Sequence, residues 1–282
     1  MPLDPMTAVK FGHFVQDAYS LLSVPDPDGF VLTEPGYMIA NILYADDLLA
    51  DLPGYITYGF IARSTAAPPY DVVIAIRGTE GIFEWMDNAV FEHQDCPFWP
   101  NGPKTEDGFT NIYKTLGTAP SLAGQPATAA LNSLVTLLGA ASVGAVTVCG
   151  HSLGGALATL LIGDIVAKAI WSRPSVYTFA SPAVGDEAFA NAFNAEVPQS
   201  WRIYNKPDIV PMLPPPLLGY AHVETPYEID SSSSTKKSII CWHSMETYLH
   251  MLDNSEPLDA DCVLGGASVT GTAPVASTSA PS

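Results

Sequence analysis

One short segment of this chain constrains its fold more than any other. A β-branched run at Ala145–Cys149 leads into Gly150-His-Ser-Leu-Gly154, and an apolar stretch from Leu153 to Ile170 follows. These five residues match the pattern G-x-S-x-G, and a strand before it with a helix after it is the setting of a nucleophile elbow. The alternative is a glycine-rich turn whose serine caps the helix. The flanking strand and helix favour the elbow, so Ser152 is our candidate nucleophile.

Strands and helices alternate along the chain on both sides of this segment. The hydrophobic spacing predicts helices at residues 6–22, 109–116, 127–138 and 187–193, and strands at 55–63, 70–78, 175–179 and 201–204. Such alternation predicts a central, mostly parallel sheet with helices on both faces. Together with the elbow it indicates an α/β fold of the α/β-hydrolase type.

The chain is long enough for one large α/β domain, which we assign to residues 1–262 of the 282. From Gly265 onward no residue is charged, so we expect residues 263–282 to form a disordered, low-complexity tail. We also expect a flexible loop at Ser231–Ser234. No apolar stretch approaches the ~18–20 residues that cross a bilayer, so no integral membrane segment is expected. The first residues lack a basic segment followed by an apolar run, so no signal peptide is visible.

Acidic residues dominate the charge of the chain. There are 29 Asp and Glu against 11 Lys and Arg, which gives a formal net charge of −18. A field of this sign repels phosphate backbones, so nucleic acid is not an expected partner. It favours an uncharged small molecule over an anionic one.

The four cysteines show no C-x-x-C pair, so a structural zinc site is not expected. Cys149 lies in the apolar run before the elbow and is interpreted as a buried thiol. In an oxidising compartment Cys241 could pair with Cys262 or with Cys96, and both pairings are open.

A serine hydroxyl needs a base that takes its proton. In the α/β-hydrolase order an acid and then a histidine follow the nucleophile, and three histidines follow Ser152. His243 lies at an apparent loop-to-helix junction, whereas His222 resembles a strand residue and His250 lies deeper in the helix. We therefore predict His243 as the base. His151 adjoins the serine, and we expect it to pack or support the site.

The acid should follow the end of a strand, where the catalytic groups of a parallel sheet lie. Asp208 follows the predicted strand at 201–204, in a loop that Pro207 and Pro211 stiffen. Asp186 precedes a helix and is better explained as an N-cap, and Asp164 lies inside a helix. Asp208 is therefore our candidate acid.

Stabilisation of a developing oxyanion requires two donors. The first expected donor is the backbone N–H of Leu153, directly after the nucleophile. The second is expected from the loop after the strand at 70–78, where Gly78 would let Thr79 face the substrate with its N–H and its hydroxyl.

These motifs together resemble those of the class 3, or fungal-type, lipases. The matching segments are Ala75–Thr79, Gly150–Gly155, Thr178–Gly185, Asn205–Pro211 and the single residue His243. The resemblance implies Ser152, Asp208 and His243 as a catalytic triad, with Thr79 and Leu153 as oxyanion donors. It also implies hydrolysis of acylglycerols or other carboxylic esters, and it favours a secreted protein. Glu106 stands where the family often has a histidine.

The resemblance further implies a lid in about residues 80–104. In this stretch Ile82, Met86, Ala89 and Val90 fall on one side of a helix, opposite acidic and amide residues. The alternative is an amphipathic helix that packs permanently on the core. As lid or substrate contacts we predict Trp85, Met86, Val90 and Phe91.

The predicted function is a serine carboxylic-ester hydrolase, foremost a triacylglycerol lipase that forms an acyl-enzyme on Ser152. The chemistry needs no metal and no cofactor, and the expected partner is an ester or lipid at an oil–water interface. A phospholipase, a feruloyl esterase, or a short-chain or polyester esterase on the same triad is the alternative. A non-catalytic lipid binder would be expected to lose a triad member, and all three are present. The sequence predicts no oligomeric state.

Overall fold

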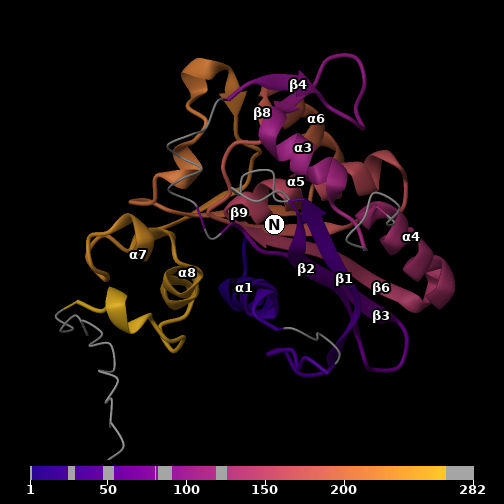
Figure 1. The fold of residues 1–282 in the computed structure, drawn as a ribbon, viewed down its shortest axis with the longest axis horizontal. Coiled ribbons are helices and arrows are strands. Elements are labelled where there is room, and N and C mark those ends of the chain that lie inside the picture. Colours follow the sequence, from indigo (N-terminus) through magenta and orange to yellow (C-terminus); the bar gives the residue numbers. More distant parts are fainter. Residues whose placement is uncertain are drawn as a thin grey trace, which may run out of the picture.

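The computed structural model describes residues 2–24, 29–46, 54–79, 81, 91–118 and 126–264. A seven-stranded sheet runs through its centre, with helices on both faces (Figure 1). The strand order is β1 (Tyr37–Asp46), β2 (Tyr55–Ser64), β3 (Tyr70–Ile76), β6 (Val143–His151), β7 (Ser175–Phe179), β9 (Ser200–Asn205) and β11 (Pro226–Ile229). From β3 to β11 neighbouring strands are parallel, and β1 and β2 form an antiparallel edge. This is the α/β architecture that the alternating pattern predicts.

The helices divide between the two faces of the sheet (Figure 1). One face carries α3 (Asp107–Thr115), α4 (Ala127–Leu138), α5 (Leu153–Ala167) and α6 (Glu187–Glu196). The other face carries α1 (Pro5–Leu22) and α8 (Met245–Leu252), which the short α7 (Ile239–His243) precedes. Single turns of 3₁₀ helix lie at Ala140–Ser142, Val210–Met212, Pro216–Leu218 and Ala260–Cys262.

Alternate side chains of the central strands point to opposite faces of the sheet, so each strand contributes residues to both cores. In β3, Val72, Ile74 and Ile76 belong to the core under α5, while Val73 and Ala75 belong to the core under α1. Burying each such side chain contributes about 1.5–3 kcal/mol. The strand must therefore be apolar on both faces, as parallel strands covered on both sides are.

A small second sheet lies beside α3 and α6 (Figure 1). Its strand order is β10 (Tyr220–Ala221), β8 (Gly185–Asp186), β5 (Lys104–Glu106) and β4 (His93–Asp95). Strands of two or three residues leave no hydrophobic alternation to recognise, and the sequence pattern did not predict them.

The longest strand that the sequence pattern missed is β1. Its pairing with β2 shifts register between Ile39 and Asn41 and again between Leu43 and Tyr44. Each irregularity interrupts the alternation of buried and exposed positions. The irregular register of this edge strand therefore removes the regular pattern by which a strand is recognised in the sequence.

The prediction of a flexible loop at Ser231–Ser234 is wrong for its first residue. Ser231 is fully buried, and its N–H donates to Oδ1 of Asn205 at 3.0 Å. Nδ2 of Asn205 in turn donates to the Ser231 hydroxyl at 2.7 Å. Two reciprocal hydrogen bonds with a buried asparagine fix this turn, although its composition is that of a mobile segment.

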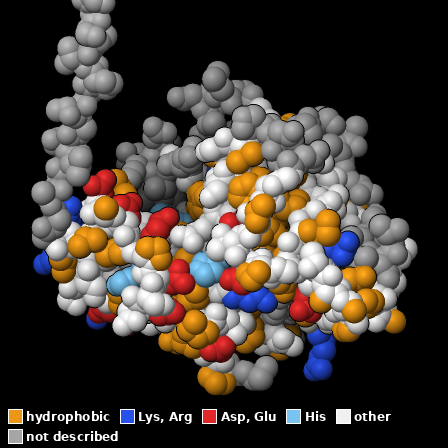
Figure 2. Space-filling view, turned by 90° about the horizontal axis from the view of Figure 1, so that it is seen from below, with side chains coloured by type: hydrophobic (Ala, Val, Ile, Leu, Met, Phe, Trp, Pro, Cys, Tyr) orange, Lys and Arg blue, Asp and Glu red, His pale blue; other side chains and the backbone are white. Residues whose placement is uncertain are grey.

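Several predictions concern residues outside the described part of the chain. Trp85, Met86 and Val90 of the predicted lid are among them, as is most of the predicted tail, residues 265–282. Phe91 is described: it is half-buried against the main core, and its ring lies 6.4 Å from that of Tyr220. None of the described helices is long and apolar enough to cross a membrane. Figure 2 shows hydrophobic side chains in small groups between polar ones on the face seen there.

A disulfide bond ties α7 to the C-terminal part of the described chain. Of the two pairings left open by the sequence, the structure forms Cys241–Cys262, and Cys96 and Cys149 are buried free thiols. Cys241 lies two residues before His243 on the same short helix. The bond therefore restrains the element that carries the candidate base.

Replacing both Cys241 and Cys262 with alanine should lower the free energy of unfolding by about 3 kcal/mol, because the bond closes a loop with a sequence separation of 21. The midpoint of thermal unfolding should fall by roughly 5–10 °C. Calorimetry of the variant and of the wild type, each with and without reductant, measures this. Reductant should lower only the wild-type midpoint, and equal melting of both proteins would contradict the expectation.

Glu106 is a buried carboxyl at the start of α3. Its side chain is 4% exposed, and Oε2 accepts the N–H of Phe109 at 2.6 Å as an N-cap. Burial raises the pKa of Glu106 to about 7, although hydrogen bonds from the Phe109 and Gly108 backbone oppose the rise. Because the folded protein holds this proton more tightly than the unfolded chain, its contribution to stability is full below pH 4.5 and is lost as the pH rises to about 7.

Glu106→Gln should therefore stabilise the protein at pH 8, by about 2–3 kcal/mol, while changing little at pH 4. The amide oxygen of glutamine can still accept from Phe109. Urea unfolding between pH 4 and pH 8 measures the difference, with the exposed Glu196→Gln on α6 as control. Equal pH dependence in Glu106→Gln and wild type would show that this carboxyl ionises normally.

Candidate active site

Ser152 lies at the sharp turn between β6 and α5. Its backbone has φ 58° and ψ −128°, a region that residues other than glycine rarely adopt, and its side chain is 1% exposed. A Cβ on Gly150 would lie 2.2 Å from the carbonyl oxygen of Gly154, so only glycine permits this turn. The predicted elbow is thus present, with its strain concentrated at the serine.

The start of α5 supplies backbone donors beside Ser152. The first intrahelical hydrogen bonds are donated by Gly155 and Ala156 to the Ser152 carbonyl, at 2.9 and 3.3 Å. The N–H groups of Leu153 and Gly154 precede them, so no earlier turn of the helix can accept their protons. The helix dipole adds positive potential at this end. The geometry suits the predicted role of the Leu153 N–H as an oxyanion donor.

Asp208 and His243 form a buried pair at the carboxyl edge of the sheet. Nδ1 of His243 donates to Oδ2 of Asp208 at 2.8 Å, and the side chains are 8% and 0% exposed. The Tyr248 hydroxyl donates to the same oxygen at 2.8 Å, and the Val210 N–H donates to Oδ1 at 3.0 Å. Three hydrogen-bond donors thus surround the Asp208 carboxyl group. Since Nδ1 of His243 carries its proton toward Asp208, Nε2 is the basic nitrogen.

Two buried polar atoms of this site have no hydrogen-bond partner within the described part of the chain: the Ser152 hydroxyl oxygen and Nε2 of His243. Buried polar atoms are nearly always paired, so two unpaired atoms in one site call for an explanation. Hydrogen bonds of catalytic groups are often long before substrate binds and shorten afterwards.

The competing histidines and acids are each held by other contacts. Nε2 of His222 donates to the Pro211 carbonyl at 2.5 Å, and burial, together with the nearby Arg202, lowers the pKa of His222 to about 4. Nδ1 of His250 donates to the Glu256 carbonyl at 2.7 Å. Both histidines are thus used in the local fold, whereas His243 keeps its second nitrogen unpaired.

The alternative acids likewise serve local structure. Asp186 caps α6 by accepting the Phe189 N–H at 2.8 Å, as the sequence indicates. Asp164 on α5 accepts from the Tyr113 hydroxyl at 2.6 Å and from Lys168 at 2.8 Å. Neither carboxylate is hydrogen-bonded to His243.

The loop after β3 lies against the elbow. A Cβ built on Gly78 would lie 2.8 Å from the Cβ of Ser152, so only glycine allows this approach. The Gly78 carbonyl accepts from Nη1 of the buried Arg77 at 2.6 Å, and its N–H donates to the Tyr19 hydroxyl at 2.9 Å. Because both the carbonyl and the N–H of Gly78 are hydrogen-bonded, the position of Thr79, the next residue, is restrained. The Thr79 hydroxyl oxygen accepts the Gly81 N–H at 3.2 Å.

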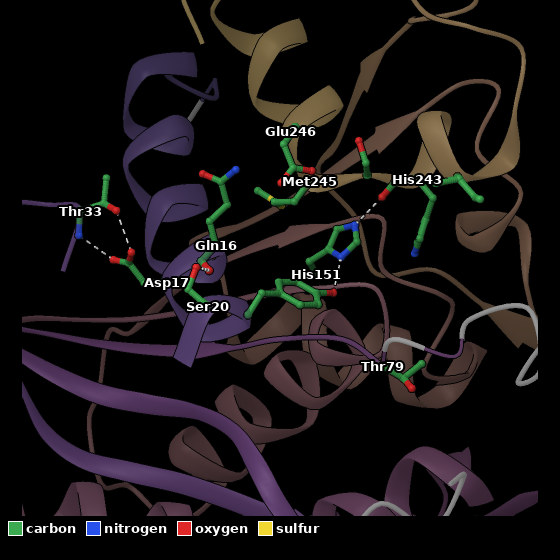
Figure 3. A pocket seen from close by; sticks show the side chains of 12 residues that line it. Gln16, Asp17, Ser20, Thr33, Thr79, His151, His243, Met245 and Glu246 are labelled. Atoms are coloured by element: carbon green, nitrogen blue, oxygen red, sulfur yellow. Dashed lines mark hydrogen bonds between the residues drawn. The ribbon is translucent and has the colours of Figure 1, made fainter. Parts of the chain in front are cut away.

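His151 links this loop to the candidate base. Its Nε2 lies 2.8 Å from the His243 carbonyl, which can only accept, so Nε2 carries the proton and Nδ1 is an acceptor. The Tyr19 hydroxyl therefore donates to Nδ1 at 2.8 Å (both bonds are dashed in Figure 3). Burial lowers the pKa of His151 well below its usual value, and the neighbouring His243 lowers it further. A neutral His151 thus supports the site, the role expected from the sequence.

Sequence reasoning missed three residues that hold the site together. Tyr19 comes from α1, more than a hundred residues before the elbow. The Tyr248 hydroxyl accepts the Asn205 N–H at 2.9 Å while it donates to Asp208. Nδ2 of Asn205 donates to the Trp242 carbonyl at 2.7 Å, directly before His243. Tyrosines and asparagines in apolar segments carry no local signal, so only the tertiary contacts show their roles.

Comparison with known proteins decides the family. A family model described as Lipase (class 3) matches residues 73–218, just over half of the chain. The chain belongs to the class 3 lipase family. The resemblance noted in the sequence is thereby confirmed. Ser152 and Asp208 lie within the matched residues, and His243 follows them.

Relatives of this class 3 lipase chain carry two kinds of name. Phospholipase A1-II 1 of Oryza sativa subsp. indica is 29% identical over 262 residues, which cover 83% of this chain and 66% of its own length. Secreted mono- and diacylglycerol lipase A of Penicillium cyclopium is 29% identical over 195 residues, covering 69% and 57%. This chain therefore spans about two thirds or less of the length of these relatives.

A solved structure supports the α/β-hydrolase fold. The crystal structure of mono- and diacylglycerol lipase from Aspergillus oryzae aligns with a TM-score of 0.64 over 81% of each chain, at 24% identity. Such a likeness establishes a shared fold. The predicted fold class is thus confirmed.

Tyr19→Phe should lower kcat by roughly 10- to 100-fold, with a much smaller change in KM, because small displacements of catalytic groups slow the chemical step. The variant removes the acceptor of the Gly78 N–H and the donor to His151. Ester hydrolysis over a range of substrate concentrations separates kcat from KM.

The matched control is Tyr177→Phe, a buried tyrosine on β7 whose ring stacks on Trp201. It should keep most of the wild-type kcat. Equal kcat values for Tyr19→Phe and wild type would show that the hydrogen bonds through His151 do not position the reacting groups.

Proposed function

We propose that this chain is a serine carboxylic-ester hydrolase that acts on acylglycerols as a lipase, with Ser152, His243 and Asp208 as its catalytic triad. One observation carries the proposal: a buried Asp208–His243 hydrogen bond of 2.8 Å lies in one site with a strained serine, and Nε2 and the serine oxygen are both unpaired. Orienting a histidine with a carboxylate is how enzymes make a serine nucleophilic at neutral pH.

The first step is acyl transfer to the enzyme. The Ser152 oxygen attacks the ester carbonyl carbon while Nε2 of His243 takes the hydroxyl proton. Asp208 holds the ring and stabilises the imidazolium. When the tetrahedral intermediate collapses, the bond to the alcohol oxygen breaks and His243 gives that oxygen its proton, which leaves an acyl ester on Ser152.

The second step returns the enzyme to its starting state. Water gives a proton to His243 and attacks the acyl carbon, and the bond to Ser152 breaks as the serine regains a proton. In both steps the negative carbonyl oxygen accepts hydrogen bonds from the Leu153 N–H and from Thr79. The hydrogen bonds of Gly78 with Arg77 and Tyr19 hold Thr79, the second oxyanion donor, in place before substrate binds.

Support for a lipid ester as substrate comes from the family and its relatives. The relatives named above act, by their names, on mono- and diacylglycerols or on phospholipids. A net charge of −18 favours the uncharged substrates. Phospholipase A1 activity is the second candidate, because relatives of that name cover 83% of this chain. The predicted lid in residues 80–104 remains part of the proposal, as the element that would cover the site in water.

Ser152→Ala should abolish hydrolysis of p-nitrophenyl esters while leaving the thermal unfolding midpoint near that of wild type. A fluorophosphonate probe should label the wild type at Ser152 alone, as mapped by mass spectrometry, and should not label the variant. Substantial turnover by Ser152→Ala, or a folded wild type that takes no label, would overturn the proposed function.

Asp208→Asn is a useful companion variant, because it keeps the shape of the site. It should lower kcat by about 10³- to 10⁴-fold, since an amide can donate to Nδ1 and so favours the wrong histidine tautomer.

A further inference from the structure

A cavity of about 650 Å³ opens beside His243, between α1 and the α7–α8 segment (Figure 3). The two sides touch at Gly12 of α1, where an added Cβ would lie 2.3 Å from Cδ2 of Leu249 on α8. One turn further along α1, at Gln16, the sides separate and the cavity begins. Thr79 and His243 both line it, so it communicates with the proposed catalytic groups.

The lining of this cavity is mixed, with polar and apolar atoms both facing the open space. Ten of its twelve described residues have side chains that can form hydrogen bonds, and the two apolar ones are Ile240 and Met245. A fatty acyl chain needs a mainly apolar pocket, so this cavity suits it poorly. The alcohol part of an ester suits it better. His243 must pass its proton to the alcohol oxygen, so this part of the substrate lies on the His243 side.

The charge of the lining discriminates between alcohols. Two carboxylates, Asp17 and Glu246, line the cavity, and among the described lining residues there is no Lys or Arg. Both oxygens of Asp17 accept from Thr33, at 2.8 and 2.7 Å, and Asp17 is buried. Glu246 is half-exposed on the first turn of α8, so it is the carboxylate that an incoming group meets. Figure 3 shows its side chain with that of Gln16 between the two helices.

The segment that follows Thr79 in the sequence is acidic as well. Residues 80–90, which follow Thr79 directly, contain Glu80, Glu84 and Asp87 and no Lys or Arg. Proteins that bind phosphate groups do so with arginine, lysine or arrays of backbone N–H groups. A carboxylate instead accepts hydrogen bonds from hydroxyl groups and repels a phosphate.

We propose that this cavity binds the hydroxyl-bearing alcohol part of an uncharged ester, as in mono- and diacylglycerols, and that Glu246 excludes phosphate-bearing headgroups. The proposal rests on the proposed function and names its substrate class. Gln16 offers donors and an acceptor to the glycerol hydroxyls, and Glu246 accepts from them. Phospholipid hydrolysis is then a disfavoured reaction of this site.

A local structural role for Glu246 is separable from this one. An acid in the first turn of a helix stabilises the helix through its dipole, wherever that helix lies. Glu187 also lies in the first turn of its helix, α6, is exposed, and does not line the cavity. Glu187→Gln therefore changes net charge and helix dipole as Glu246→Gln does, and it is the matched control.

The test compares kcat/KM on dioctanoylglycerol with kcat/KM on dioctanoyl phosphatidylglycerol, in micelles of one uncharged detergent. Wild type should prefer the diacylglycerol. Glu246→Gln should raise the phospholipid-to-diacylglycerol ratio by about 3- to 10-fold, and Glu246→Lys by more, because a like charge near the phosphate is removed or reversed. Glu187→Gln should leave the ratio within about twofold, and the Glu246 effect should shrink at high salt.

A second comparison isolates the hydroxyl contacts. Monooctanoylglycerol and methyl octanoate share an acyl chain and differ only in the alcohol. Gln16→Leu should lower the kcat/KM ratio of the first to the second by about 3- to 10-fold, the effect of losing a hydrogen bond to the glycerol.

Fluorophosphonate labelling of Ser152 is measured on every preparation. If wild type takes no label at Ser152 and hydrolyses no ester, the proposed function itself is wrong. A labelled, active wild type that prefers the phospholipid, or a ratio that Glu246→Gln leaves unchanged, overturns the cavity assignment alone. An equal rise with Glu187→Gln also overturns it, because net charge would then account for the effect.

Discussion

The hydrogen bond between Asp208 and His243 is the contact on which the rest of the site depends. It joins the loop after β9 to the end of α7, and it is fully buried. A buried carboxylate is unfavourable unless donors surround it, and Tyr248 and the Val210 N–H complete its shell. The disulfide at Cys241 restrains the same helix two residues before His243. The fold thus makes one charged group tolerable, and this group sets which nitrogen of His243 is basic.

A second set of contacts couples the parts that must act together. The Gly78 loop, Tyr19 and His151 form one directed series of hydrogen bonds that ends at the carbonyl of His243. The direction of every hydrogen bond in this series is determined, because the His243 carbonyl at its end can only accept. The loop of one proposed oxyanion donor and the backbone of the proposed base are therefore held by the same neutral histidine. Tyr19 and His151 would therefore orient the groups that contact substrate without contacting its reacting atoms themselves.

The proposed preference among lipid esters depends on the cavity beside the site. The core under α5 is built mainly from apolar side chains, whereas the cavity between α1 and α8 is lined by two acidic side chains and no described Lys or Arg. The low count of basic residues, because of which nucleic acid is not an expected partner, also holds at this cavity, where the described lining has no Lys or Arg. In each case a negative field disfavours phosphate. Electrostatic repulsion of phosphate thus bears both on the partners expected for the chain and on the proposed choice among lipid esters.

The sequence by itself determined the elements with strong local signals. The elbow, the order of strands and helices, and the candidates Ser152, Asp208 and His243 all follow from hydrophobic period, glycine placement and motif order. Tertiary structure alone decided the bulged strand β1, the Cys241–Cys262 pairing and the roles of Tyr19 and Asn205. The physical reason is separation along the chain. A period or a turn is encoded by neighbouring residues, but a hydrogen bond between α1 and β6 exists only after the sheet has brought them together.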